Sequence, residues 1–213
     1  MAIDIIGVSG SPIKNSNTDR LVRSMLDASG LEVEFIKLSD LNIRPCLGCK
    51  KCVPDNICKV NDDFPELAEK IKKAKALVIG AYTPYGQIDA FTKALLERFW
   101  SLRHVNNLLQ GKLCATVVTG LNPMVTDEVS KAMATELRDY EFMNLVGQIS
   151  IQGNLPCLTC GVGDTCKMSA LTVMYGPEAK TADYGYVKVE DQQHICDEAV
   201  DIGSAIGEKI QNY

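Results

Sequence analysis

The stretch "IDIIGVSGSPIKNSNTDRL" (Ile3 to Leu21) decides the fold. Its first part, Ile3 to Val8, is almost continuously apolar or β-branched, which is typical of a strand buried on both faces of a parallel sheet. A loop of small and polar residues follows, and Asn17 is a suitable N-cap for a helix that ends at Gly30. A strand, a polar loop and a helix in this order predict the first unit of an α/β domain.

The same alternation repeats along the chain. Amphipathic helical patterns separate four further apolar runs, and Asp63 with Glu66 resembles a capping box at the start of one helix. Five such strands with helices on both faces predict a doubly wound, flavodoxin-like parallel sheet with strand order 2-1-3-4-5. The four further strands are expected at Glu32 to Leu38, Ala76 to Tyr82, Leu113 to Thr119 and Asn144 to Ile151.

Two segments do not fit this alternation. Residues 42–61 and 153–189 both carry cysteines and read as insertions. A chain of 213 residues buries enough surface to fold without disulfides or metals. We therefore expect residues 1–213 to form a single flavodoxin-like domain with two cysteine-bearing insertions.

Charge and hydropathy restrict the class of protein. The net charge is −5 and no basic stripe is visible, which argues against nucleic acid as a partner. The longest apolar run, near Ala76 to Tyr82, is too short to span a membrane, and "MAIDIIGVSGSP" does not read as a signal peptide. We expect a cytoplasmic location. Nine cysteines in a reducing compartment then indicate metal or redox chemistry before structural disulfides.

The loop "SGSPIKNSNT" follows the first strand and leads into the first helix. It is neither a G-x-G-x-x-G nor a Walker A motif. At this place the backbone N–H groups and the helix dipole favour a dianion. The alternative is an ordinary polar loop with a good N-cap. The side chains expected to contribute to a phosphate site are Ser9, Ser11, Asn15, Asn17 and Thr18.

A second loop, "YTPYGQIDAFTK", follows the third strand. That strand flanks the point where the strand order reverses, so a ligand is expected to contact both loops. The Pro-Tyr-Gly turn can offer backbone N–H groups and an aromatic face to a flat ring, although it could equally be an ordinary turn. The residues expected to line the ring are Thr83, Pro84, Tyr85, Gly86, Gln87 and Ile88.

Both loops resemble a known family. "SGSPIKNSNTDRL" followed by "AYTPYGQIDAFTKALLERF" resembles the NAD(P)H-dependent FMN reductase branch of the flavodoxin-like superfamily. With "CLGCKKCVPDNIC" inserted before the third strand, the chain is more similar to the iron–sulfur flavoproteins, whose hallmark is C-x2-C-x2-C followed by a fourth cysteine. The resemblance implies FMN at the two loops, and it also implies oligomers in which the cluster of one subunit approaches the FMN of another.

The resemblance covers about Ile3 to Trp100 well and the remainder only by element order. Two departures stand out. The Asp-Arg pair with which the family ends its third helix is Glu97-Arg98 here. The stretch from Leu155 to Val189, with its own cysteines, matches no usual pattern of the family.

The cysteine spacing itself indicates a cluster. Cys46, Cys49, Cys52 and Cys58 read C-x2-C-x2-C-x5-C, which matches the ferredoxin-type run of [4Fe–4S] sites. Zinc usually takes two separated pairs, and thiol or disulfide redox chemistry is the third alternative. Gly48 removes a Cβ where the chain is expected to curl closely around the cluster.

A second group, Cys157, Cys160 and Cys166, reads C-x2-C-x5-C. Three ligands leave a tetrahedral or cubane site one short, and Cys196 is the nearest spare thiol. The group is interpreted as a second metal site, with iron–sulfur preferred over zinc. Redox thiols, or a loop with ordinary thiols, remain alternatives.

Together these features predict an FMN-dependent oxidoreductase that passes electrons between FMN and a [4Fe–4S] cluster. No catalytic base or nucleophile is expected, because the cofactors supply the chemistry. We expect ferredoxin or NAD(P)H as donor, a small-molecule acceptor and a homo-oligomer, either dimer or tetramer. The alternatives are an NAD(P)H-dependent FMN reductase with zinc-stabilised cysteine loops and a thiol or metal redox sensor.

Overall fold

The structure is a computed structural model that describes residues 3–212. Its centre is a five-stranded sheet with the order β2-β1-β3-β4-β5. All neighbouring strands are parallel. The predicted fold class and strand order are therefore confirmed. The strands are β1 (Ile5–Ser9), β2 (Val33–Lys37), β3 (Ala76–Tyr82), β4 (Leu113–Gly120) and β5 (Asn144–Gln152).

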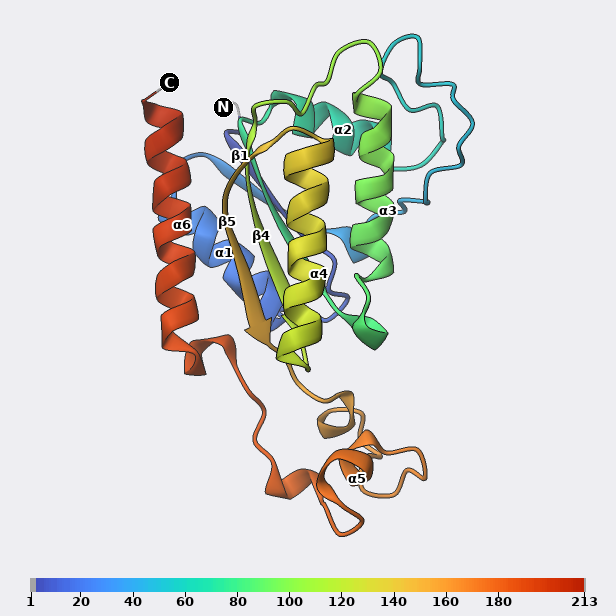
Figure 1. Cartoon of the computed structure of the whole chain (residues 1–213), viewed down its shortest axis with the longest axis vertical. Coiled ribbons are helices and arrows are strands. Elements are labelled where there is room, and N and C mark those ends of the chain that lie inside the picture. Colours follow the sequence, from blue (N-terminus) through green and yellow to red (C-terminus); the bar gives the residue numbers. More distant parts are fainter. Residues whose placement is uncertain (1–2, 213) are drawn as a thin grey trace.

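Helices cover both faces of the sheet. Helices α1 and α6 pack on one face, and α2, α3 and α4 pack on the other (Figure 1). The helices are α1 (Asn17–Ala28), α2 (Phe64–Lys73), α3 (Ala90–Phe99), α4 (Pro123–Thr135), α5 (Ala170–Tyr175) and α6 (Gln193–Gln211). Short 3-10 turns lie at Leu38–Asp40, Pro84–Gly86, Trp100–Leu102, Pro156–Leu158, Thr181–Asp183 and Val189–Asp191, and a π turn at Glu136–Tyr140 extends α4.

The strands are continuously apolar because both faces of the sheet are buried. In β3, Leu77 and Ile79 contribute to the core under α2 and α3, whereas Val78 contributes to the core under α1 and α6. Each fully buried aliphatic side chain of this size contributes about 1.5–3 kcal/mol of transfer free energy. A polar residue at any of these positions would face a core on one side or the other.

Helices α1 and α6 approach each other unusually closely. A Cβ at Gly203 would collide with the carbonyl group of Met25, and a Cβ at Gly207 would collide with the carbonyl group of Ser29. These two glycines, one turn apart on α6, therefore let the two backbones pack in direct contact. This contact holds α1, and with it the loop that precedes α1, against the sheet.

Two predicted helix caps differ from the structure. The N-cap of α1 is Ser16, not Asn17, because the Ser16 Oγ accepts from the N–H of Asp19 at 3.1 Å and the Asp19 carboxylate accepts from the N–H of Ser16 at 3.2 Å. This reciprocal pair is a capping box. The box predicted at Asp63 does not form, because the Asp63 carboxylate accepts from the N–H of Asn42 at 2.6 Å instead.

The two insertions occupy different ends of the molecule. Residues 42–61, called the first cysteine segment below, lie beside α3 (Figure 1). Residues 153–189, called the second cysteine segment, extend beyond the carboxyl ends of the strands and contain α5 (Figure 1). Within residues 3–212, no helix has the length and apolar character needed to cross a membrane.

Candidate functional site

The loop between β1 and α1 has the geometry of an anion site. The N–H groups of Asn17 and Thr18 lie in the first turn of α1 and have no hydrogen-bond partner within residues 3–212. Such groups at a helix N-terminus bind anions, and the helix dipole adds to the attraction. The side chain of Ser11 is buried and accepts from the N–H of Ile13, whereas Asn15 is exposed with a left-handed φ of 52°.

A buried carboxylate lies beneath this loop. The Oδ1 of Asp19 accepts from the hydroxyl of Ser9 at 2.6 Å, and its Oδ2 forms an ion pair with the Nζ of Lys37 at 2.6 Å. Lys37 also donates to the carbonyl of Ile13 at 2.7 Å. This pairing offsets a negative charge that would otherwise repel a phosphate. Lys37 reaches the loop because the parallel register places it beside Ser9.

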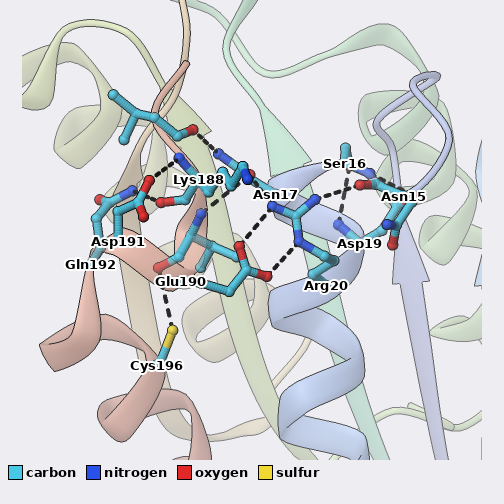
Figure 2. Close-up of polar contacts among 12 residues, drawn as sticks. Asn15, Ser16, Asn17, Asp19, Arg20, Lys188, Glu190, Asp191, Gln192 and Cys196 are labelled. Atoms are coloured by element: carbon cyan, nitrogen blue, oxygen red, sulfur yellow. Dashed lines mark hydrogen bonds and ion pairs between the residues drawn. The ribbon is translucent and has the colours of Figure 1, made fainter. Parts of the chain in front are cut away.

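The side chain of Asn17 connects the loop between β1 and α1 to the second cysteine segment and does not point into the anion site. Its amide Nδ2 donates to the carbonyl of Val187 at 3.0 Å, and its Oδ1 accepts from the N–H of Val189 at 3.3 Å (Figure 2). The neighbouring Arg20 forms an ion pair with Glu190 at 2.6 Å (Figure 2). The start of α1 and the end of this segment are therefore one hydrogen-bonded unit.

The loop after β3 forms a tight turn at the same edge of the sheet. Tyr85 has a left-handed φ of 52° and a fully exposed ring, and Gly86 follows with a φ of 74°. Thr83 is held by its N–H, which donates to the carbonyl of Thr119 at 2.9 Å. An exposed aromatic ring in a strained turn is available for a flat ligand.

Asp89 fixes the position of this turn. Its buried carboxylate accepts from the N–H of Tyr82 at 3.1 Å and from the N–H and hydroxyl of Thr92 at 2.8 Å each. Burial raises the pKa of Asp89 despite these hydrogen bonds. Gly10 lies against the same group, because a Cβ at Gly10 would collide with Asp89 and Thr92. The two ligand loops are thus packed against each other through one carboxylate.

A third loop lies at this edge, between the end of β4 at Gly120 and the start of α4 at Pro123. The sequence analysis did not predict its part in the site. The hydroxyl of Thr119, near the end of β4, forms a hydrogen bond of 2.8 Å with the hydroxyl of Thr18. Asn122 caps α4 by accepting from the N–H of Met124 at 3.1 Å. The side chains of Ile13 and Tyr85 in the first two loops and of Met124 in the first turn of α4 are exposed. Strand order alone could have predicted this loop, because β4 ends beside β3.

The four cysteines of the first cysteine segment line one hollow at the end of α3. Cys46, Cys49, Cys52 and Cys58 all line it, together with Arg98. Desolvation raises the pKa of Cys52, and the neighbouring thiols of Cys58, Cys46 and Cys49 raise it further. Four thiols on one short segment are the donor set of a [4Fe–4S] cluster, so the residues fit that group.

Unusual backbone conformations shape this segment. Gly48, Lys50 and Asn56 have left-handed φ values of 60°, 59° and 56°. No atom lies within 4 Å of a Cβ placed on Gly48, so the conformation rather than close approach explains this glycine. Asn56 is buried, and its side chain binds the carbonyl of Asn106 at 2.6 Å and the N–H of His104 at 2.8 Å.

The second cysteine segment does not arrange its thiols in the same way. Cys160 and Cys166 are exposed, and Cys157 is half-buried. The hydroxyl of Ser169, followed by nearby backbone N–H groups, lowers the pKa of Cys157. The thiol of Cys196, in the first turn of α6, donates to the carbonyl of Val189 at the end of the segment, at 3.3 Å (Figure 2). Over residues 3–212, neither segment holds three ligands close enough for a single metal ion.

Comparison with known proteins places this geometry in a family. Residues 3–153 match the family described as NADPH-dependent FMN reductase. The chain belongs to this family. The matched residues include all three loops at the carboxyl edge and the whole first cysteine segment, but almost none of the second.

Curated relatives of this FMN reductase family member carry iron–sulfur names. An iron–sulfur flavoprotein of Methanocaldococcus jannaschii is 37% identical over 119 residues, which cover 54% of this chain and 61% of the relative. An iron–sulfur flavoprotein of Methanosarcina thermophila is 31% identical over 119 residues, which cover 54% of this chain and 62% of the relative. The matches thus span about three fifths of the length of these relatives.

Solved structures share the fold of this family member. RosB, with the bound intermediate 8-demethyl-8-formylriboflavin-5'-phosphate, has a TM-score of 0.65 and 14% identity over 99% of this chain and 81% of that chain. The apo form of an NADH:FMN oxidoreductase has a TM-score of 0.58 and 13% identity over 97% of this chain and 89% of that chain. These identities are low enough that the likeness concerns the fold alone.

The predicted relationship to the flavodoxin-like FMN reductases and iron–sulfur flavoproteins is therefore confirmed. The family supports FMN as the cofactor and an FMN-dependent oxidoreductase as the class of enzyme. The individual FMN-binding and cluster-binding residues stay predictions. Sequence reasoning missed Asp19, Lys37 and Thr119 at the carboxyl edge of the sheet. It also did not connect Arg98 or Asn56 with the first cysteine segment.

Proposed function

We propose that this protein is an FMN-dependent oxidoreductase that carries a [4Fe–4S] cluster on Cys46, Cys49, Cys52 and Cys58. The single observation that carries the proposal is that these four thiols line one hollow in a chain of the FMN reductase family. The names of the curated relatives add support. The spacing C-x2-C-x2-C favours a cluster over zinc.

FMN is proposed to lie at the carboxyl edge of β1, β3 and β4. The unpaired N–H groups of Asn17 and Thr18 would bind its phosphate, and the turn from Thr83 to Ile88 would lie against its ring. Bound there, FMN supplies chemistry with one or two electrons. The protein's own task is to hold the ring, and the Asp89 carboxylate does this indirectly by fixing the turn.

Within one chain the two proposed centres lie at opposite ends of α3. The flavin turn ends just before Ala90, where α3 begins, whereas the cysteine hollow is lined by Arg98 and Trp100 at its other end. A helix of 10 residues is about 15 Å long. As the resemblance to the iron–sulfur flavoproteins implies, we propose that electrons pass between the cluster of one subunit and the FMN of another, in a homodimer or homotetramer.

The remaining parts of the proposal concern partners. A ferredoxin would deliver single electrons to the cluster, whereas NAD(P)H would deliver a hydride to FMN. The acceptor is proposed to be a small molecule that reaches the flavin edge. The family description favours NADPH as a donor, and the exposed cysteine segment favours a protein donor.

Anaerobic purification followed by cofactor analysis tests the proposal. We expect about one FMN and about four iron and four sulfide per chain, with broad iron–sulfur absorbance beneath the flavin bands. FMN with zinc and no sulfide would instead identify an FMN reductase with a zinc-stabilised segment. Protein that contains metal but binds no added FMN would point to a sensor and reject the oxidoreductase.

A further inference from the structure

Arg98, in the last turn of α3, is the largest fully buried side chain among the described residues, with 1% of its surface exposed. A buried guanidinium is costly unless it is paired and hydrogen-bonded. Its partner is Asp62, whose side chain is also fully buried. The Nη1 of Arg98 lies 2.6 Å from one carboxylate oxygen, and Nη2 lies 3.0 Å from the other.

The guanidinium has two further acceptors, and both belong to the first cysteine segment. Nη2 also donates to the Sγ of Cys58 at 3.2 Å, and Nη1 donates to the backbone carbonyl of Arg44 at 2.8 Å. The plane of the group lies over the ring of Phe64, 4.4 Å from its centroid. Arg98 therefore contacts the chain on both sides of the cysteines. It binds the carbonyl of Arg44 before the first cysteine, and it binds the last cysteine, Cys58, and Asp62 after it.

A contact between guanidinium and sulfur has a particular chemical meaning. A neutral thiol is a weak acceptor, whereas a thiolate that ligates iron accepts a charge-assisted hydrogen bond. Arginine remains charged under all ordinary conditions and presents its donors in a fixed plane. The bidentate pair with Asp62 fixes that plane, so one N–H stays directed at the Cys58 sulfur.

We propose that Arg98 is a positioning residue for the iron–sulfur cluster, because it holds the Cys58 thiolate in place and raises the reduction potential of the cluster. This inference rests on the cluster proposed above. Reduction adds one negative charge to the cluster, and hydrogen bonds to its sulfur ligands stabilise the reduced form. A buried N–H donor has a larger effect than the exposed lysines of the same segment, because solvent screens those charges.

The test compares variants of the full chain, purified anaerobically with FMN. Arg98→Lys keeps a charge but loses the planar donor pair, and Arg98→Met loses both. Arg44→Met is the matched control, since the Arg44 side chain is half-exposed and contacts Asp62 and Asn61 but no sulfur. The readouts are iron and sulfide content, the rate of iron loss to a chelator, and the midpoint potential of the cluster.

We expect Arg98→Met to lower the midpoint potential and to lose iron at least tenfold faster than the wild type. Arg98→Lys should lie between the two, and Arg44→Met should match the wild type. Unchanged potentials in both Arg98 variants, with clusters retained, would overturn the inference. A wild type without iron would reject the proposed cluster itself, which is a different result.

A measurement on the unmodified protein covers the case in which the Arg98 variants fail to fold. Protein labelled with 15N-arginine is reduced, and pulsed electron paramagnetic resonance records couplings between the cluster and nitrogen. We expect a 15N coupling typical of a hydrogen bond to a ligand sulfur. That coupling should persist in labelled Arg44→Met protein. A reduced cluster without any arginine 15N coupling would refute the positioning role.

Discussion

The two cysteine segments have nearly the same spacing but differ in how they are attached to the fold. The first is held by buried polar groups, with Arg98 and Asp62 at its base and Asn56 near the loop that follows α3. The second has only a small apolar cluster of its own, to which Leu155 and Leu171 belong, and it is joined to α1 by Asn17 and its neighbours.

This difference shows that cysteine spacing alone does not define a site. Long-range hydrogen bonds to α3 hold the first segment so that all four of its cysteines line one hollow. The second segment lies beyond the carboxyl ends of the strands (Figure 1) and is joined by hydrogen bonds to the start of α1. Its position favours a role near the proposed FMN site, whereas the attachment of the first segment favours the proposed cluster site.

The largest expected effect is on iron content. Cys49→Ala should lose nearly all iron, because it removes one of the four thiols around the hollow. The FMN-binding domain should remain folded, since Cys49 is exposed and outside the sheet core. The matched variant Cys157→Ala/Cys160→Ala should keep about four iron per chain. Iron and sulfide assays on the two variants and the wild type test this prediction, and Cys49→Ala protein with the iron content of the wild type would contradict it.

The same assays test the second cysteine group as a metal site. About eight iron per wild-type chain, falling to about four in Cys157→Ala/Cys160→Ala, would establish a second cluster and remove the contrast between the segments. Zinc that disappears only in this double variant would identify a zinc site instead. We expect neither result, because the segment itself supplies three thiols and the thiol of Cys196 donates to the carbonyl of Val189.

A smaller effect is expected on the attachment of the first segment. Asn56→Ala removes buried hydrogen bonds to Asn106, His104 and Val105 and places alanine at a left-handed φ that asparagine tolerates better. We expect a loss of about 1–3 kcal/mol in local stability. Hydrogen exchange should show faster opening of the first segment, with FMN binding unchanged.

The control for Asn56→Ala is Asn106→Ala, which keeps the side chain of Asn56 and its acceptor on the backbone of residue 106. This control should exchange like the wild type. Equal protection of the first segment in Asn56→Ala and Asn106→Ala would show that the buried amide does not hold the segment, and the contrast between the two attachments would then be wrong.

The ion pair between α1 and the residue that directly follows the second segment should contribute less to the local stability. Arg20 and Glu190 are partly exposed, and such pairs typically contribute about 0.2–1 kcal/mol. The hydrogen bond from Arg20 lowers the pKa of Glu190 below its usual value of 4.5. The contribution of this ion pair to stability is therefore fully present above pH 4.5, and it is lost as the pH falls through the lowered pKa of Glu190.

A double-mutant cycle with Arg20→Met and Glu190→Gln measures this coupling through hydrogen exchange of the second segment. We expect a small coupling energy near neutral pH that declines under acid conditions. FMN affinity should fall slightly in Arg20→Met, because Arg20 also donates to the carbonyl of Asn15 in the phosphate loop at 2.6 Å. A coupling that does not change with pH would contradict the role of Glu190.

Much of the fold could be predicted because its signals are local. Runs such as Ala76 to Tyr82 are apolar throughout because both faces of the strand are buried, and the polar loop after β1 directly precedes a helix. The thiols of the first segment are likewise close in sequence. The bounds of most strands differed by one or two residues, since β1 is Ile5–Ser9 rather than Ile3 to Val8. The caps differed because Ser16 forms the capping box with Asp19 and because the Asp63 carboxylate accepts from the N–H of Asn42.

The contacts that hold the site could not be predicted in the same way. Arg98 and Cys58 are separated by 40 residues, and Asn17 and Val187 by 170. Such pairs depend on the paths of loops whose sequences carry no periodic pattern. A buried arginine at the end of an apolar helix was the available signal, but its partner could be identified only once the first segment was placed beside α3.

The smallest expected effect concerns thiol reactivity in the second segment. The hydroxyl of Ser169 and backbone N–H groups lower the pKa of Cys157, whereas burial in β4 raises the pKa of Cys114 to about 12. The thiolate of Cys157 is therefore expected to persist at a lower pH, and alkylation followed by mass spectrometry should modify it while Cys114 stays protected. Ser169→Ala should shift the alkylation profile of Cys157 to higher pH without affecting Cys160. An unchanged profile would mean that Ser169 does not stabilise the thiolate of Cys157. The second segment would then have no thiol whose pKa is lowered by the Ser169 hydroxyl.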